Sequence, residues 1–318
     1  MERVILSICV PVFNHSKYVI EALDSIKKQK TKYNYEVLIG EDCSTDDSRK
    51  VLKEYKETCP DNFKFYFREK NMYKSSPNNS EDLKNRAKGK YIIVLEGDDY
   101  WINEEKIEKQ VDFLESHPDY IGVTHRCIVV DQKSNPIDFT YQACYENEFL
   151  WKHYMSGLLP GQTATFMYRN IFGDEKKYNV SILRKGLVPG DRLTSFVTLS
   201  YGRIYCMDEI MSAYRYITNE GSSFSASFKG DKNEEKKYYQ ELMRYAQSRK
   251  KEIYRYAECL YFRSMIKSYN FAPRRIEAFI DDFKLIDDKL FVLFKWIKYK
   301  IKKDIIKSPV FSAARDRA

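Results

Sequence analysis

The chain has 318 residues, of which 43% are hydrophobic and 31% are charged, and this balance excludes an intrinsically disordered protein. The length suits one large domain with an appendage, or two domains. The formal net charge of +8 is unevenly placed, because much of the lysine excess follows residue 229. We therefore expect a folded domain that carries a basic C-terminal region.

The seven cysteines are scattered along the chain, with no C-x-x-C pair and no cluster of Cys and His. Several lie inside apolar runs, which predicts buried free thiols in a reducing compartment rather than disulfides or a zinc site. No apolar run approaches the roughly 18 residues of a membrane span, and the chain enters a strand pattern without a signal peptide. We expect a cytoplasmic protein.

The first hundred residues alternate between strand patterns and helix patterns. Short apolar runs predict the strands, and apolar residues at helical spacing predict the helices between them. We expect Ser16 to cap the first helix and Thr45 or Asp46 to cap the second. The alternation indicates βαβ units and a mostly parallel sheet. The expected strands are 5–12, 35–40, 63–67 and 91–95, with a short helix at 82–88 before the last of them.

Three carboxylates crowd together after the strand at 91–95, which Gly97 ends: Glu96, Asp98 and Asp99. Like charges this close repel, so the cluster costs stability unless a cation or a hydrogen-bonding ligand lies there. Ligands of open α/β sheets bind just past the carboxyl ends of strands. A divalent cation that shares phosphate oxygens suits the cluster, and a solvated acidic turn is the alternative.

Three motifs in this half of the chain share the order and spacing seen in family 2 glycosyltransferases. They are Val10-Pro11-Val12-Phe13-Asn14, Gly40-Glu41-Asp42-Cys43-Ser44-Thr45-Asp46 and Leu95-Glu96-Gly97-Asp98-Asp99-Tyr100-Trp101. The chain resembles that family, in its bacterial polysaccharide type, less sharply up to about residue 228. The resemblance implies the GT-A fold, an α/β nucleotide-sugar-binding domain with a mostly parallel central sheet flanked by helices.

The same resemblance implies roles for individual residues in binding the donor. Asp42 matches the carboxylate that accepts a hydrogen bond from the base, and Lys88 is placed to bring a cation near phosphate. Taken alone, Pro11 is also a strand stop, Asn14 a cap, Asp42 a turn former and Lys88 a solvated helix end. The residues expected to line the nucleoside pocket are Pro11, Phe13 and Asn14.

For the acidic cluster, the resemblance implies a metal site for Mg²⁺ or Mn²⁺. Asp98 matches the metal-binding position of the family's D-x-D motif, and Asp99 is a supporting or second ligand. Glu96 takes the first position, where the longer side chain favours a ribose or water-mediated contact. Trp101 is either core or an aromatic platform for a sugar.

The second half of the chain supplies a candidate catalytic base. Asp191 follows a Pro-Gly turn at the beginning of a helix, where the family carries its base, although Asp is also a favoured N-cap. Arg215 is a weaker candidate for a phosphate contact, because Ile217 and Thr218 replace the family's usual His beside the metal. We expect further strands at 120–130 and 163–169, a helix between 103 and 118 that Asn103 caps, and an acceptor-binding insertion at 134–158.

The sequence after residue 229 predicts basic helices that are joined near 270–273. Between 289 and 307, apolar residues fall on one helix face and lysines lie away from it. This pattern is typical of a helix on an anionic membrane surface, and equally of a helix packed on the catalytic domain or on a second protomer. The domains expected are 1–228, with a nucleotide-sugar half at 1–101 and an acceptor half at 102–228, and a helical region at 229–318.

Together these features predict an inverting, metal-assisted glycosyltransferase. It would move a sugar from a UDP-sugar or another nucleotide-diphosphate donor to a saccharide or lipid-linked saccharide, without nucleic acid and at the inner face of the cell membrane. A sugar nucleotidyltransferase is an alternative, but it usually has a glycine-rich loop where Phe13-Asn14-His15-Ser16 stands. A non-catalytic nucleotide-sugar binder, a membrane-binding module and a homo-oligomer stay open.

Overall fold

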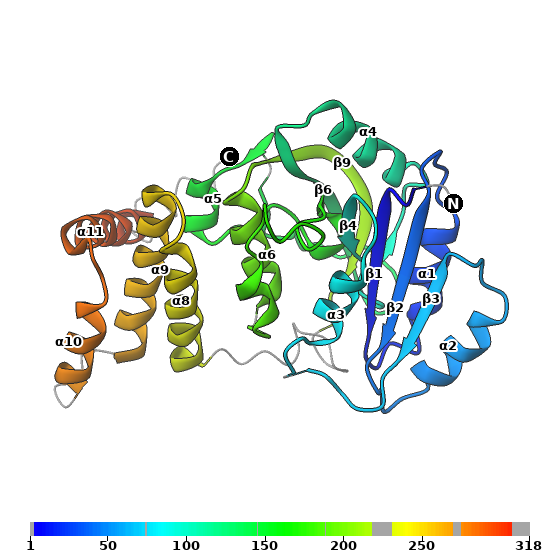
Figure 1. Ribbon diagram of the computed structural model, residues 1–318, viewed down its shortest axis with the longest axis horizontal. Helices are drawn as coiled ribbons and strands as arrows, with labels where there is room; N and C mark the ends of the chain where they lie inside the picture. The colour runs from blue at the N-terminus through cyan, green and yellow to red at the C-terminus, as the bar shows by residue number, and fades with distance from the viewer. Residues whose placement is uncertain are drawn as a thin grey trace. The chain divides into compact units, whose positions relative to one another are not determined.

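A mixed nine-stranded sheet forms the centre of the N-terminal unit in the computed structural model, which describes residues 3–73, 75–144, 146–187, 189–217, 231–269 and 275–306 (Figure 1). The chain divides into two units, Met1–Phe228 and Lys229–Ala318. The strand order is β3-β2-β1-β4-β8-β6-β9-β5, and β7 pairs with β9. The strands are β1 (Leu6–Val12), β2 (Tyr35–Glu41), β3 (Phe63–Phe67), β4 (Tyr91–Val94), β5 (Tyr100–Trp101), β6 (Tyr120–Val130), β7 (Glu148–Phe149), β8 (Met167–Arg169) and β9 (Arg203–Arg215).

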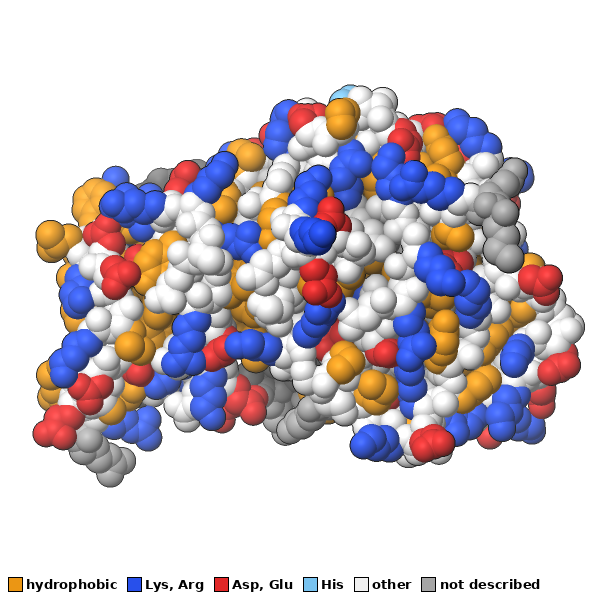
Figure 2. Space-filling model, viewed as in Figure 1, with side chains coloured by type: hydrophobic (Ala, Val, Ile, Leu, Met, Phe, Trp, Pro, Cys, Tyr) orange, Lys and Arg blue, Asp and Glu red, His pale blue; other side chains and the backbone are white. Residues whose placement is uncertain are grey.

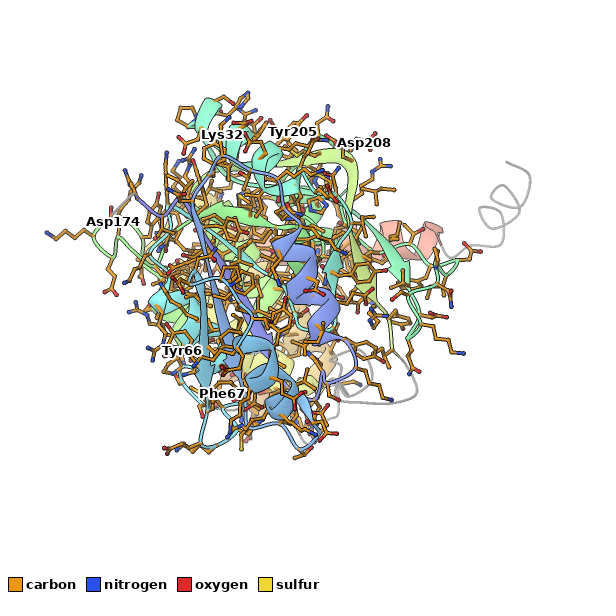
Figure 3. All side chains as sticks on the ribbon, turned by 90° about the vertical axis from the view of Figure 1, so that its right-hand side faces the viewer. Lys32, Tyr66, Phe67, Asp174, Tyr205 and Asp208 are labelled. Carbon is orange, nitrogen blue, oxygen red and sulfur yellow. The ribbon has the colours of Figure 1, made fainter. Side chains whose placement is uncertain are left out.

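The four strands of the first hundred residues are parallel to one another. Antiparallel pairing begins at β8, which lies between β4 and β6, and β5 and β7 are antiparallel to β9. β6 and β9 are parallel to each other, so the second half of the sheet is mixed. In Figure 3, Tyr66 and Phe67 of β3, at one end of this order, lie well apart from Tyr205 and Asp208 of β9, the strand next to the other end. The α/β sheet with flanking helices expected from the sequence is confirmed.

Helices cover both faces of the parallel strands, with α1 and α3 on opposite sides (Figure 1). The apolar side chains Leu23 and Ile26 of α1 and Leu83 of α3 are fully buried. β4 is buried along its whole length, which explains its continuous apolar sequence. The helices of this unit are α1 (Val19–Lys27), α2 (Ser48–Lys56), α3 (Asn79–Arg86), α4 (Lys106–Ser116), α5 (Trp151–Ser156) and α6 (Gly190–Leu199), with 3₁₀ turns at Thr163–Thr165 and Ser181–Arg184.

The strand order reverses between β1 and β4. From β1 the chain builds outward through β2 to β3, then crosses back to place β4 on the other side of β1. Ligands of open α/β sheets bind at such a switch point, beyond the carboxyl ends of the strands. The segments that leave β1 and β4 at this point are the ones that carry the candidate site residues.

Several local expectations from the sequence are wrong. α1 begins at Val19 rather than directly after Ser16, whose backbone N–H donates to Asp46 of the neighbouring loop. By contrast, the expected capping contact of Asp46 is present, because its Oδ1 accepts from the N–H of Ser48, where α2 begins. The expected strand at 163–169 opens with a 3₁₀ turn, so only β8 is strand. The region expected to be an acceptor insertion contains β7 and α5, whose two and six residues are too short for a periodic pattern.

Trp101 belongs to the core. Its ring is 4% exposed, and its Nε1 donates to the backbone oxygen of Ala164 over 3.1 Å. The ammonium of Lys106 lies 4.2 Å from the ring centroid on the buried side. Because the ring is enclosed, it offers no platform to a sugar.

The C-terminal unit is helical: α8 (Lys232–Ala246), α9 (Lys251–Tyr269), α10 (Ile276–Lys284) and α11 (Lys289–Ile306). α11 packs on α9 through Val292, which is fully buried, and through Trp296, whose ring meets Phe262 edge to face. Of the described helices, none is both long and apolar enough to cross a membrane.

The central strand should be the most sensitive part of the fold to loss of apolar volume. Ile93 of β4 is fully buried, so Ile93→Ala is expected to lower the free energy of unfolding by about 2–5 kcal/mol. Urea unfolding of the full chain measures the change. Ile210→Ala, at a position of β9 that is 48% exposed, is the matched control and should change it by less than about 0.5 kcal/mol. Equal effects would contradict the assigned position of β4.

Candidate active site at the carboxyl edge of the sheet

The loops after β1 and β2 are bonded to each other by side chains that the sequence suggests as helix caps. Asn14 Oδ1 accepts from the backbone N–H of Thr45 over 2.8 Å. Asp46 Oδ2 accepts from the N–H of Ser16, and Ser48 Oγ accepts from the N–H of His15. Asn14 has a φ of 58°, a left-handed conformation that Asn tolerates better than most residues. These bonds bring the expected nucleoside-binding loop of Pro11, Phe13 and Asn14 beside the segment after β2.

Asp42 leaves the end of β2 at the same edge. Its N–H donates to the carbonyl of Val12 over 2.9 Å, which ties it to the β1 loop. Its Oδ1 accepts from the N–H of Met72 over 2.8 Å. Burial raises the pKa of the carboxyl, because the charged form loses hydration there. Asp42 therefore stands at a fixed place next to the residues expected to line the nucleoside pocket.

The acidic turn after β4 folds back toward β1. The N–H of Gly97 donates to the carbonyl of Pro11 over 3.2 Å. A Cβ on residue 97 would lie 2.8 Å from Nδ1 of His15, so only glycine leaves room for that ring. The imidazole Nε2 of His15 lies 3.7 Å from Oδ2 of Asp98. His15 is thus a site residue that sequence reasoning missed, although it lies within the loop that was singled out.

Asp99 is an anchoring residue rather than a second metal ligand. Its side chain is 1% exposed, Oδ1 accepts from the N–H of Arg215 over 2.8 Å, and Oδ2 accepts from Nε2 of Gln162 over 2.6 Å. Burial and the charges of Asp98 and Glu96 raise the pKa of Asp99 well above its usual range. Because both oxygens are bonded inside the protein, the expected role of Asp99 in metal binding does not fit its surroundings.

Arg215 holds the acidic turn in place and is too enclosed for the phosphate contact considered from the sequence. The guanidinium is 1% exposed, and its Nε donates to the carbonyl of Asp98 over 2.9 Å. Its other nitrogens bond Glu21 and the turn at 131–134. The rings of Tyr18 and Tyr100 lie against the guanidinium. Thr218 lies outside the described residues.

Asp191 lies in the first turn of α6, and its carboxylate interacts electrostatically with Glu96. Its Oδ1 accepts from the N–H of Arg192 over 2.6 Å. Burial raises the pKa of Asp191, and burial together with the charges of Asp98 and Asp191 raises that of Glu96 to about 8. Tyr141, from the region expected to bind acceptor, also interacts with both carboxylates. The candidate base and the acidic turn therefore converge, although nearly a hundred residues separate them.

Lys84, rather than Lys88, lies beside the acidic side chains. Lys88 precedes β4 and is exposed, and its N–H donates to Glu36 at the start of β2, so it lies at the amino end of the strands. Lys84, on α3, interacts electrostatically with Glu96 and Asp191. Burial lowers the pKa of its ammonium, and these carboxylates oppose that shift. The sequence predicts both lysines on one short helix. Only the packing of α3 shows that Lys84 lies near the acidic side chains and Lys88 does not.

The residues of the turn suit a cation that is bound mainly by its substrate. The described residues contain no group of three or more His, Cys, Asp or Glu side chains that could hold a metal ion. Mg²⁺ commonly takes one or two carboxylates from the protein and completes its shell with water and phosphate oxygens. Asp98 and Glu96 can supply those carboxylates, whereas a site closed by protein ligands alone does not fit.

Comparison with known proteins identifies the family. The family model of Glycosyl transferase family 2 matches residues 7–178, more than half of the chain. The chain belongs to glycosyltransferase family 2. The matched range includes the loops after β1, β2 and β4, and it ends before Asp191.

Relatives of this family 2 member resemble it over part of their length. A protein of Mycobacterium tuberculosis without assigned function is 36% identical over 125 residues, which are 39% of this chain and 36% of that protein. The poly(ribitol-phosphate) β-N-acetylglucosaminyltransferase TarS of Staphylococcus aureus is 32% identical over 112 residues, 35% of this chain and 19% of TarS. TuaG of Bacillus subtilis, named as a teichuronic acid biosynthesis glycosyltransferase, is 25% identical over 219 residues, 69% of this chain and 82% of TuaG.

The fold also resembles solved structures. Residues 1–349 of S. aureus TarS in complex with UDP-GlcNAc superpose with a TM-score of 0.65 at 17% identity, covering 90% of this chain and 82% of that one. The likeness confirms the GT-A fold for this family 2 member. At 17% identity this likeness is evidence for the fold and for nothing further.

The raised pKa of Glu96 has a measurable effect on stability. Between its ordinary pKa of 4.5 and about 8, the folded chain keeps a proton that the unfolded chain has released. The free energy of unfolding should therefore fall as the pH rises through this window. Glu96→Gln cannot ionise, so its melting temperature should fall less between pH 5 and pH 8 in the presence of a chelator.

Glu54→Gln, on the exposed face of α2, is the control for this measurement and should follow the unmodified chain. A Glu96→Gln variant with the same pH profile as Glu54→Gln would mean that Glu96 is ionised in the folded state near neutral pH.

Proposed function

We propose that this chain transfers a sugar from a nucleotide-diphosphate donor, a UDP-sugar, to a saccharide hydroxyl with inversion. The observation that carries the proposal is the convergence of Glu96, Asp98 and Asp191 at the switch point of the sheet. Membership in family 2 and the fold likeness to TarS with its bound UDP-GlcNAc support it.

The donor would lie across the loops that follow β1, β2 and β4. In this proposal Oδ2 of Asp42 accepts a hydrogen bond from the base, and Pro11, Phe13 and Asn14 enclose the nucleoside. Asp98 and Glu96 would hold Mg²⁺ or Mn²⁺, which when bound neutralises charge on the departing diphosphate. Lys84 would add a positive charge to the same side of the site. Arg215 and Asp99 keep Asp98 in position without contacting the donor.

The acceptor hydroxyl would lie beside Asp191, on the side of the donor sugar away from the diphosphate. Inverting transfer needs a general base there to take the proton of the attacking hydroxyl. The raised pKa of Asp191 makes its carboxylate a stronger base than an exposed aspartate, and the bond from Arg192 to Oδ1 fixes its orientation. Tyr141 would line the acceptor side.

The acceptor class that we propose is a saccharide or lipid-linked saccharide of cell-surface polysaccharide or glycoconjugate assembly. TarS and TuaG are named for reactions of this kind. The whole activity is a proposal, because the matched segment spans about a third or less of the mycobacterial relative and of TarS.

Two substitutions that replace a carboxylate by an amide of nearly the same shape separate the proposed roles of Asp191 and Asp98. Asp191→Asn should lower kcat by about 10²–10⁴-fold, the usual contribution of a general base, while UDP binding in the presence of Mn²⁺ stays the same. Asp98→Asn should weaken the Mn²⁺-dependent part of UDP binding. Calorimetric titration with UDP and an assay of UDP release from UDP-sugars measure the two effects.

Lys88→Gln is the control in both assays and should bind and turn over like the unmodified chain. Equal loss of UDP binding in Asp191→Asn would remove Asp191 from its role as base. Release of pyrophosphate instead of UDP would indicate nucleotidyl transfer.

We also infer that the C-terminal unit binds an anionic membrane surface through α11. Leu290, Phe294 and Ile297 form one exposed apolar face, and Leu290 is 83% exposed. The exposed Lys295 and Lys298 accompany this face, with the ammonium of Lys298 over the ring of Phe294. Figure 2 shows hydrophobic and basic side chains exposed on this unit, interspersed with acidic ones. A basic residue near an anionic surface contributes about 1 kcal/mol. The side chains of 301–307 lie outside the described residues.

Vesicle sedimentation tests this inference with the full chain. Binding should be strong to vesicles that contain phosphatidylglycerol, weak to pure phosphatidylcholine, and reduced by salt. Leu290→Ser combined with Phe294→Ser should abolish it, whereas Ile102→Ser, at an exposed site of the N-terminal unit, should not. A double variant that binds vesicles normally but changes from an oligomer to a monomer would show that the face joins two copies of the chain.

A further inference from the structure

Two cysteines that are far apart in the sequence meet in the N-terminal unit. Cys144 lies just before β7 and Cys206 lies in β9, and both side chains are buried. The pairing of β7 with β9 brings them together, with the N–H of Cys206 donating to the carbonyl of Asn147 over 2.9 Å. The N–H of Cys144 and Sγ of Cys206 donate to the carbonyls of consecutive residues, Leu159 and Pro160, so the two thiols are close and interact with each other. The sequence shows no such pair, because the contact depends on strand pairing.

A histidine and a glutamate complete the surroundings of Cys144. Nδ1 of His153, on α5, lies 3.4 Å from Sγ of Cys144, and Nε2 of His153 lies 3.1 Å from Oε1 of Glu146. The interaction with the neighbouring Cys206 thiol is the main cause that lowers the pKa of Cys144 to about 6, and it raises the pKa of Cys206. By contrast, burial raises the pKa of Cys9 and of Cys127 to about 12 and that of Cys259 to about 11.

We propose that Cys144 and Cys206 form a redox-active thiol pair that a hydroperoxide converts into a disulfide. The Cys144 thiolate attacks one peroxide oxygen, the O–O bond breaks, and water leaves with a proton from the surroundings, which gives a sulfenic acid. The Cys206 sulfur then attacks the sulfenic sulfur, the S–S bond forms, and the S–O bond breaks to release a second water. Two thiols are oxidised by two electrons, and one hydrogen peroxide is reduced to two waters.

The thiol pair is bonded to the segment that anchors the acidic turn. The N–H of Cys144 donates to the carbonyl of Leu159 over 2.9 Å, and Sγ of Cys206 donates to the carbonyl of Pro160 over 3.8 Å. Two residues further along, Gln162 donates to Oδ2 of Asp99. Oxidation removes the S–H that bonds Pro160, so it should disturb the placement of Gln162 and, through Asp99, of Asp98. This second part rests on the proposed function.

The covalent part is tested on the full chain by mass mapping after treatment with hydrogen peroxide. Under non-reducing conditions we expect one cross-linked peptide pair that joins Cys144 to Cys206, a mass loss of two hydrogens, and reversal by dithiothreitol. Cys206→Ser should stop at a sulfenic acid on Cys144, which a 1,3-dicarbonyl reagent captures. Cys259→Ser, a buried cysteine of the other unit, is the control and should still form the cross-link.

The cross-link is mapped in the unmodified chain, so this result remains valid even if a substituted variant folds poorly. Oxidation spread over other cysteines, or none at Cys144 under conditions that oxidise the partly exposed Met72 and Met207, would overturn the proposal. In the transfer assay, peroxide should lower kcat/KM at least threefold in the unmodified chain and in Cys259→Ser, and leave Cys144→Ser unchanged. A cross-link in a chain without transferase activity would contradict the proposed function but still support the proposed thiol pair.

Discussion

The site depends on how the carboxylates after β4 are held close together in a poorly hydrated place. Three acidic side chains there repel one another, and burial penalises their charged forms further. The protein offsets this with Arg215, whose backbone N–H bonds Asp99 and whose guanidinium bonds the carbonyl of Asp98. Gln162 supplies the second bond to Asp99. The side chain of Asp98 is thereby left facing His15, at the edge where a ligand would bind.

The loops around the acidic turn are also held in place by hydrogen bonds from neighbouring segments. Short polar side chains after β1 and β2 bond across to the neighbouring loop, as Asn14 does with Thr45 and Asp46 with Ser16. The other oxygen of Asp46 accepts from the N–H of Ser48 at the start of α2. A pocket built from such bonds is preorganised, since the backbone N–H groups it orders are already satisfied. The left-handed conformation of Asn14 is part of that arrangement. A rigid sheet edge and mutually bonded loops suit a site that must place a nucleotide and a sugar together.

The acceptor side is built differently. Tyr141, Cys144 and Gln162 come from a region with short elements, and their positions depend on the pairing of β7 with β9 and on bonds to Leu159 and Pro160. Such a region tolerates sequence change better than the buried strands, because fewer apolar contacts constrain it. The thiol pair lies where this region meets the segment that anchors the acidic turn, and this is why we propose it as a point of redox control.

By itself, the sequence determined the elements whose pattern is local and strong. The buried runs at β1, β2, β4 and β6 and the motifs around Asp42 and Asp98 can be identified because strand burial and turn chemistry act over a few residues. Only the tertiary structure decided which side chains meet. The crossing of α3 selects Lys84 over Lys88, strand pairing joins Cys144 to Cys206, and the fold back of β9 turns Arg215 into an internal anchor. These contacts join residues that are far apart in the sequence. A local sequence pattern does not specify the burial of each side chain or the distances between them, and these determine which contacts form.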